Sequence, residues 1–277
     1  MIMAYVIVGL FGLAFGSFLN VCIARLPRHE SIVSPGSHCP RCAHPIRWYD
    51  NVPLLSYALL GGRCRDCRAR ISPVYPIVEL VTAGVLLADF YEYSLSPAFV
   101  KWAFFSLLII LLIFTDLLER RIPHAVTGLG IASGLAFSFV VPVDNRPAGW
   151  LLAHWGVFPG ATMNSVIGAA AGALAGGGLF YVVGEVFYRL RHVEGLGFGD
   201  VMLMLMAGVF MGAPMTLLTI MLGSFLGTLI AAPLHLATTR FRNYAWPFGT
   251  FLGVAAIFSS LGGQALIAAY LRWSGIS

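Results

Sequence analysis

The chain has 277 residues, of which 58% are hydrophobic and only 10% are charged. Soluble domains carry about 25% charged residues on average, so this composition excludes an ordinary soluble domain and indicates a membrane protein. The formal net charge of +5 gives no support to nucleic-acid binding, because the basic residues sit on no fold suited to reading bases.

Eight stretches of the chain are apolar enough to enter a bilayer. A spanning helix needs about 20 such residues, and each span must be helical because lipid offers the backbone no hydrogen-bond partner. We therefore expect an all-α polytopic membrane protein with about eight transmembrane helices. The expected spans are 2–23, 76–91, 98–117, 125–142, 163–187, 200–212, 215–236 and 247–270, and the pair 200–212 and 215–236 is the least clear because its first member is short.

The basic residues set the expected orientation of these helices. The first of them, Arg25, follows the first apolar run, which predicts an uncleaved helix with its N-terminus outside. Cytoplasmic loops are enriched in arginine and lysine, and a cytoplasmic segment 24–75 leaves only Lys101, Arg146 and Arg272 outside. The basic residues then expected in the cytoplasm are Arg25, Arg28, Arg41, Arg47, Arg63, Arg65, Arg68, Arg70, Arg120, Arg121, Arg189, Arg191, Arg240 and Arg242.

Segment 24–75 carries four of the five cysteines, in the motifs CPRC at 39–42 and CRDC at 64–67. Two such pairs can put four thiolates on one metal, in the closed tetrahedral geometry of structural zinc. Two disulfides are the alternative, which a reducing cytoplasm disfavours. We therefore expect a small cytoplasmic zinc-binding domain over residues 24–75. Its expected ligands are Cys39, Cys42, Cys64 and Cys67, with His38 and His44 beside the first pair as spare ligands.

The fifth expected span contains the sequence GAAAGALAGGG at 168–178. Gly168, Gly172 and Gly176 recur every four residues and so share one face of a helix. No strand precedes them, which argues against a dinucleotide-binding loop. Small residues at this spacing are typical of close contacts between membrane helices, and we expect such a contact here.

Two aspartates are expected at the same depth of the membrane. Asp116 ends the third span and Asp200 begins the sixth, both on the cytoplasmic side, and carboxylates at membrane depth mark functional sites by default. They fit an aspartyl protease pair, in which one carboxylate takes a proton from water and the other, protonated, polarises the scissile carbonyl. Taken alone, Asp200 fits a helix N-cap equally well.

Glycines surround Asp200 in the sequence GLGFGD. Gly195, Gly197 and Gly199 permit close approach of another backbone, as an extended peptide substrate requires. Three further acidic residues lie near the ends of spans. Asp89 is expected at the outer interface, whereas Glu79 and Glu185 fit a structural role and a site role equally well.

Six stretches, spread over nearly the whole length of the chain, carry a family resemblance. They are GSFLNVCIARLP at 16–27, CPRCAHPIRWYDNVPLLSYALLGGRCRDC at 39–67, ISPVYPIVEL at 71–80, DLLERRIP at 116–123, GFGD at 197–200 and PFGTFL at 247–252. In this order they resemble the type IV prepilin peptidases, the bifunctional leader peptidase/N-methyltransferases of type IV pilus and type II secretion systems.

The resemblance implies an aspartyl protease of the bacterial inner membrane. Such an enzyme cleaves the basic leader of prepilins or pseudopilins after a glycine at the cytoplasmic face, and then methylates the new N-terminal amine with S-adenosylmethionine. Asp116 and Asp200 match the family's catalytic aspartates, and Gly197 and Gly199 match its motif glycines. The four cysteines of the CxxC pairs match its metal ligands.

The chain then has three expected parts. Residues 1–23 form the first transmembrane helix, 24–75 the zinc-binding domain and 76–277 a transmembrane aspartyl protease bundle. No S-adenosylmethionine motif can be read, and we place the methyl-donor site near the cysteine loop and the sequence RWYDNVP at 47–53, with Asp50 and Glu79 as candidates.

Three positions depart from the family pattern. Members often have lysine where this chain has Met202, aspartate where it has His124, and proline where it has Thr250. The aspartate pair survives all three departures, and the missing lysine affects the charge near Asp200.

Two other functions remain open. A presenilin-type protease would have tyrosine before its first aspartate, where this chain has Thr115, and a Pro-Ala-Leu stretch that is absent from this sequence. A zinc-knuckle membrane scaffold or transporter would use Asp116 and Asp200 along an ion path. A transporter typically buries such carboxylates near the bilayer midplane, whereas these two are expected near its cytoplasmic edge.

Overall fold

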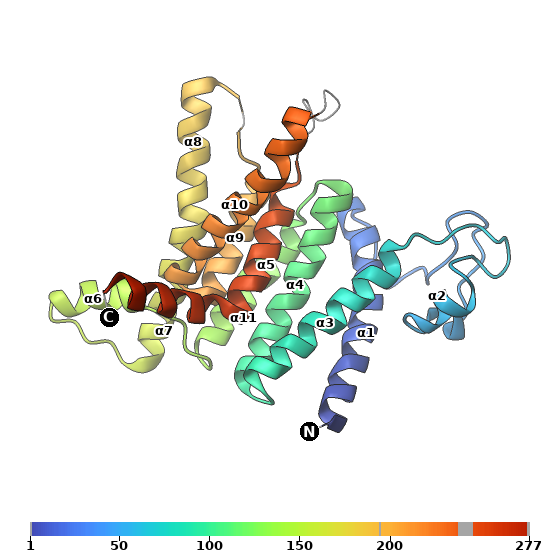
Figure 1. Cartoon of the computed structure of the whole chain (residues 1–277), viewed down its shortest axis with the longest axis horizontal. Helices are drawn as coiled ribbons and strands as arrows, with labels where there is room; N and C mark the ends of the chain where they lie inside the picture. The colour runs from blue at the N-terminus through green and yellow to red at the C-terminus, as the bar shows by residue number, and fades with distance from the viewer. Residues whose placement is uncertain (1, 194, 238–245, 276–277) are drawn as a thin grey trace. The chain divides into compact units, whose positions relative to one another are not determined.

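The structure is a computed structural model that describes residues 2–193, 195–237 and 246–275. These residues form helices and loops, with two isolated bridges as the only β-pairing among them (Figure 1). The all-α class expected from the sequence is confirmed. The chain divides into two compact units, Met1–Phe99 and Val100–Ser277.

The N-terminal unit is built on two apolar helices, α1 (Ile2–Arg25) and α3 (Val74–Tyr93). Their backbones approach closely because α1 has glycine at the contact: a Cβ on Gly16 would lie 2.6 Å from the Cα of Glu79. Asn20 adds a hydrogen bond from its side-chain amide to the carbonyl of Tyr75, at 3.0 Å. The cysteine loop between the helices contains η1 (Leu26–Arg28), η2 (Trp48–Asn51) and α2 (Leu55–Leu59).

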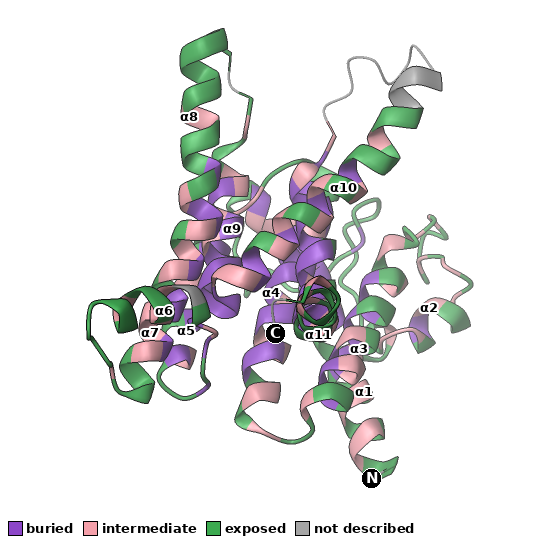
Figure 2. Ribbon diagram, turned by 60° about the vertical axis from the view of Figure 1, so that its left-hand side comes forward, coloured by how far each residue is buried: buried purple, intermediate pink, exposed green. Residues whose placement is uncertain are grey.

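The C-terminal unit surrounds α9 (Phe198–Met211), which carries no charge after Asp200. A helix that is apolar on all sides is buried in a core, and α9 lies among the buried residues in Figure 2. Its Phe210 packs on Phe105, with ring centroids 5.0 Å apart. The other helices of this unit are α4 (Pro97–Glu119, whose first three residues belong to the N-terminal unit), α5 (His124–Ser138), α6 (Arg146–His154), α7 (Ala161–Ala173), η3 (Leu174–Gly178), α8 (Leu179–Arg191), α10 (Ala213–Ala237) and α11 (Phe248–Ser274).

The glycine stripe of α7 and η3 lies directly against α9. A Cβ on Gly172 would overlap the carbonyl oxygen of Gly208, and one on Gly176 would overlap that of Met204. Any side chain larger than hydrogen would force the two helices apart. The close helix contact predicted from the spacing is therefore confirmed.

Among the residues that the structure describes, six helical segments are long and apolar enough to cross a membrane, judged by length and composition. The regions expected as the fourth and sixth spans form α5, of 15 residues, and α9, of 14 residues, both below the roughly 20 that a span needs. A multi-pass membrane protein is thus supported, while the number of eight spans stays a prediction. Arg240 and Arg242, part of the predicted orientation, lie outside the described residues.

Candidate active site

Asp116 and Asp200 are carried by the ends of two different helices. Asp116 lies in the last turn of α4 and is buried. Asp200 is the third residue of α9, because Gly197 occupies the N-cap position and its carbonyl accepts the N–H of Asp200 at 3.0 Å. Asp200 is therefore not the N-cap of its helix, and the capping interpretation of this residue is wrong.

Gly249, at the start of α11, lies between the two carboxylates. A Cβ built on it would be 3.0 Å from Oδ1 of Asp200 and 3.1 Å from Oδ2 of Asp116. The two oxygens are thus at most about 6 Å apart, the sum of these distances. One water with two hydrogen bonds of about 2.7–3.0 Å can bridge such a gap. The structure brings together the two aspartates that the sequence singled out.

Thr250 holds the Asp116 carboxylate by two groups. Its backbone N–H donates to Oδ2 of Asp116 at 2.6 Å, and its hydroxyl lies 3.0 Å from the same oxygen. The hydroxyl is also 3.3 Å from the carbonyl of Ile113, a longer and competing contact. The carboxylate is consequently fixed against the start of α11 although 134 positions separate the two residues.

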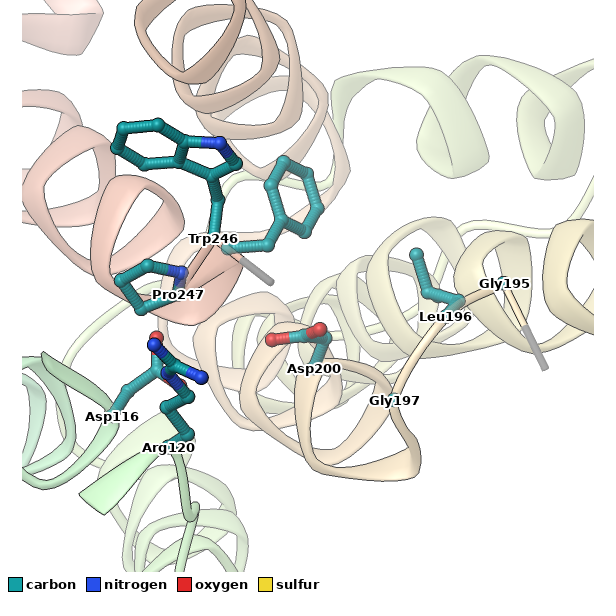
Figure 3. Close-up of a pocket in the computed structure, with 9 residues that line it drawn as sticks. Asp116, Arg120, Gly195, Leu196, Gly197, Asp200, Trp246 and Pro247 are labelled. Atoms are coloured by element: carbon teal, nitrogen blue, oxygen red, sulfur yellow. The ribbon is translucent and has the colours of Figure 1, made fainter. Parts of the chain in front are cut away.

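A cavity of about 470 Å³ opens onto this pair. In Figure 3 the Asp200 carboxylate points toward the side where Asp116 and Arg120 lie. The lining combines the two acids with one cation, two glycines and four apolar side chains. These residues are Asp116, Arg120, Gly195, Leu196, Gly197, Asp200, Trp246, Pro247 and Phe248.

The glycines before Asp200 have different surroundings. Gly197 lines the cavity, and a Cβ there would lie 3.5 Å from Oδ2 of Asp200. Gly195 also lines it, and a side chain at this position would overlap the ring of Phe187. Gly199 instead packs against Ile122, whose Cβ would be 3.0 Å from a Cβ at 199. Gly195 and Gly197 thus line the cavity, whereas Gly199 packs against Ile122. The approach of a substrate backbone at these glycines stays a prediction.

The four cysteines of the N-terminal unit form one cluster. Their sulfurs all lie within 4.8 Å of one another, and Sγ of Cys39 is 3.8 Å from Sγ of Cys67. Tetrahedral zinc with Zn–S bonds of about 2.3 Å places its sulfurs about 3.8 Å apart. All cysteines that the structure describes are free thiols, so the disulfide alternative finds no support in these residues.

The two CxxC turns have the same backbone construction. In the first, Cys39 N–H donates to the His44 carbonyl at 2.9 Å, and in the second, Cys64 N–H donates to the Ala69 carbonyl at 2.8 Å. The N–H groups of Cys42 and Arg41 lower the pKa of the Cys39 thiol, whereas desolvation and the neighbouring thiols raise the pKa of Cys42. A lowered pKa favours the thiolate that binds metal. The geometry and the donor chemistry both fit a structural zinc.

The carboxylates considered for other roles have partners. Asp50 accepts hydrogen bonds from Arg65 at 2.6–3.1 Å, and this guanidinium lowers the pKa of Asp50. Oε2 of Glu79 accepts the backbone N–H of Leu54 at 2.9 Å, which ties the cysteine loop to α3. Glu185 pairs with Arg189 on the surface of α8, at 2.7 Å.

The structure also places Asp89 and two of the residues that depart from the family pattern, His124 and Met202. Asp89 is fully buried in α3, four residues before this helix ends at Tyr93, and its place at the outer interface stays a prediction. His124 begins α5 and its ring packs on Phe198, with centroids 5.7 Å apart. Met202 is half-buried on α9, two residues after Asp200.

Sequence reasoning missed the contribution of the start of α11 and of the two residues before it. Trp246, Pro247 and Phe248 line the cavity, and Thr250 binds Asp116 directly. The available signal was the stretch PFGTFL, which matches the family and departs from it at Thr250. In the sequence, Arg120 contributes only to the predicted orientation of the helices in the membrane. In the structure it lies one helical turn after Asp116 and lines the same cavity.

Two family models match the chain, one in each compact unit. Residues 10–93 match the Bacterial Peptidase A24 N-terminal domain, and residues 102–232 match the Type IV leader peptidase family. No solved structure matches the chain.

Curated relatives named prepilin leader peptidase/N-methyltransferase agree with these matches. One from Aeromonas salmonicida is 32% identical over 96% of this chain and 93% of its own, and one from Pseudomonas aeruginosa is 30% identical over the same shares. One from Myxococcus xanthus is 37% identical over 83% of this chain, which spans 62% of that longer protein. With both units matched and the aspartate pair assembled, this chain belongs to the type IV leader peptidase family.

Proposed function

We propose that this chain cleaves the basic leader of type IV prepilins or pseudopilins after a glycine and then N-methylates the new N-terminal residue. The observation that carries the proteolytic half is the meeting of Asp116 and Asp200 around Gly249 in one cavity. The relatives' names and the family models support the same reading.

Peptide hydrolysis at this pair needs one ionised and one protonated carboxylate. The ionised group takes a proton from water as the water oxygen attacks the scissile carbonyl, while the protonated group hydrogen-bonds to the developing oxyanion. A proton then passes to the leaving amine as the C–N bond breaks, and the pair returns to its starting protonation. The gap of at most about 6 Å between Oδ1 of Asp200 and Oδ2 of Asp116 accommodates this water.

The cavity walls suit an extended and partly apolar peptide. Gly195 and Gly197 leave room for a second backbone beside Asp200, as a strand passing the carboxylates requires. Leu196, Trp246 and Phe248 provide apolar surface on the remaining sides. A prepilin whose leader emerges from its membrane helix presents both features.

We assign the methyl-transfer half to the N-terminal unit, near the cysteine loop. Cys39, Cys42, Cys64 and Cys67 would hold one zinc that stabilises this loop, as their spacing within 4.8 Å supports. S-adenosylmethionine, implied by the relatives' names, supplies an electrophilic methyl group to the free amine of the cleaved pilin. Asp50 and Glu79 remain the carboxylates proposed for the donor site, and both already hold parts of the loop in place.

We further place the protein in the bacterial inner membrane with the active site facing the cytoplasm. The six apolar helices support a multi-pass protein, and the arginine-rich segment 24–75 supports a cytoplasmic cysteine loop. The transporter alternative is disfavoured because both aspartates lie within a turn of a helix end, not at mid-helix as a midplane ion site requires.

The test separates the two reactions. Purified chain is incubated with a prepilin and S-adenosylmethionine carrying a labelled methyl group, and leader loss and label on the pilin are measured independently. We expect cleavage after glycine in the absence of the methyl donor, and label only on cleaved pilin. A prepilin that stays intact would refute the protease, and cleaved pilin without label would refute the methyltransferase alone.

A further inference from the structure

The Asp116 carboxylate is held by one residue from a distant part of the chain. Thr250 places two donors on the single oxygen Oδ2, its N–H at 2.6 Å and its hydroxyl at 3.0 Å. Both residues are less than one-tenth exposed, so water competes little for these bonds. Hydrogen bonds to a charged acceptor are about twice as strong as neutral ones.

The position of Thr250 in its helix explains why the bond is available. It is the third residue of α11, and the first four N–H groups of a helix have no carbonyl partner four residues earlier. The N–H of Thr250 also lies 3.2 Å from the Pro247 carbonyl, a longer contact than the 2.6 Å to Oδ2 of Asp116. The positive end of the helix dipole also favours a carboxylate there. Asp116 therefore acts as an acceptor for the start of α11 while it projects from the end of α4.

Fixing one oxygen by two donors also fixes the other oxygen of the carboxylate. Rotation about the Cβ–Cγ bond of Asp116 would break both bonds, so Oδ1 has a single position relative to α11. The preceding residue, Gly249, keeps the space between Asp116 and Asp200 open. Two consecutive residues of α11 thus set the orientation and the separation of the pair.

We propose that Thr250 is a positioning residue for the Asp116 carboxylate, holding it in the orientation that the attacking water requires. This role rests on the proposed protease function. A proline at this position would have neither an N–H nor a hydroxyl to donate to Asp116. Misplacement of a catalytic group lowers turnover more than it lowers binding.

Three substitutions separate the two donors. Thr250→Val removes the hydroxyl and keeps the shape and the N–H, Thr250→Ser keeps both donors, and Thr250→Pro removes both at a place in the first helical turn that tolerates proline. Thr219→Val is the matched control, because it removes a buried hydroxyl that lines no part of the cavity. That hydroxyl donates to the Met215 carbonyl at 2.8 Å within α10 and lies 3.5 Å from Sδ of Met211 on α9. Each variant is assayed for kcat and KM of leader cleavage and for its thermal unfolding temperature.

We expect Thr250→Val to lower kcat about ten-fold, as loss of one hydrogen bond to a charged group implies, with KM within about two-fold of the parent chain. Thr250→Ser restores kcat, Thr250→Pro lowers it further, and Thr219→Val leaves it unchanged. The inference is wrong if Thr250→Val keeps the parental kcat, if it changes KM alone, or if it no longer folds. If the parent chain itself leaves prepilin intact, the proposed function fails and not the role of Thr250.

Discussion

At the residue scale, the candidate site depends on the absence of a side chain at position 249. A Cβ on Gly249 would lie 3.0 Å from Oδ1 of Asp200 and 3.1 Å from Oδ2 of Asp116, so any side chain there would crowd both carboxylates. Ile122 closes the same space, with its Cδ1 2.9 Å from a Cβ at 249. Position 249 requires glycine because a side chain would crowd Asp116 and Asp200, and not because the backbone adopts a conformation that only glycine allows.

Gly249→Ala should therefore lower the rate of leader cleavage by about 100-fold or more, because the added methyl group displaces the water or the carboxylates. Gly262→Ala on the same helix is the control, since no atom lies within 4 Å of a Cβ there. The measurement is kcat of both variants on one prepilin. Equal rates for the two alanine chains would show that a side chain at position 249 does not disturb the carboxylate pair.

At the element scale, α9 is positioned by its contact with the glycine stripe of α7 and η3. Carbonyl oxygens of Gly208 and Met204 face Gly172 and Gly176 directly. Without a hydrophobic driving force between helices in lipid, such close packing is a main source of their association. The contact fixes the helix whose first turn carries Asp200.

Gly172→Ala should lower the free energy of unfolding by about 1–3 kcal/mol, the usual cost of overpacking a tight contact. Gly178→Ala, where a Cβ meets Leu174 Cδ2 at an ordinary 3.8 Å, should leave the chain as stable or slightly more stable. Unfolding of both variants in the same detergent measures the difference. A Gly172→Ala chain as stable as the control would contradict the close contact.

The parts of the fold and of the candidate site that could be predicted are those that depend on local patterns in the sequence. Three signals are local in the sequence, and each predicted the correct element. They are the acids at the ends of two apolar runs, the cysteines in CxxC pairs and the glycines four residues apart. Whether α11 begins beside Asp116 is not local, because Thr250 lies 134 residues from its partner. Hydrophobic periodicity reports which face of a helix is buried, and not which helix ends meet, so the roles of Gly249, Thr250 and Trp246 needed the structure.

At the scale of the whole molecule, the two chemical features lie in different units. The cysteine cluster belongs to Met1–Phe99, and every residue that lines the cavity belongs to Val100–Ser277. The two family models divide the chain in the same way. The three-part division expected from the sequence stays a prediction, and its first two parts lie in the N-terminal unit.

Removal of the metal should consequently affect the two reactions unequally. The parent chain should carry about one zinc, and Cys64→Ala should lose it together with most methyl transfer while retaining leader cleavage within a few-fold. Cys22→Ala is the control, because Cys22 is buried in α1 outside the cluster. Metal content and both activities are measured on the same preparations. Parent chain without zinc, or cleavage lost as completely as methyl transfer, would contradict this division.

The central claim is that Asp116 and Asp200 together cleave prepilin, and single isosteric substitutions test it most directly. Leader cleavage is measured for Asp116→Asn and Asp200→Asn chains that fold like the parent, with Glu185→Gln as the control for a surface carboxylate paired only with Arg189. We expect each asparagine variant to lose at least about 1,000-fold in kcat, because neither half of the pair alone can both accept and donate the proton. Substantial cleavage by either variant would contradict the shared site.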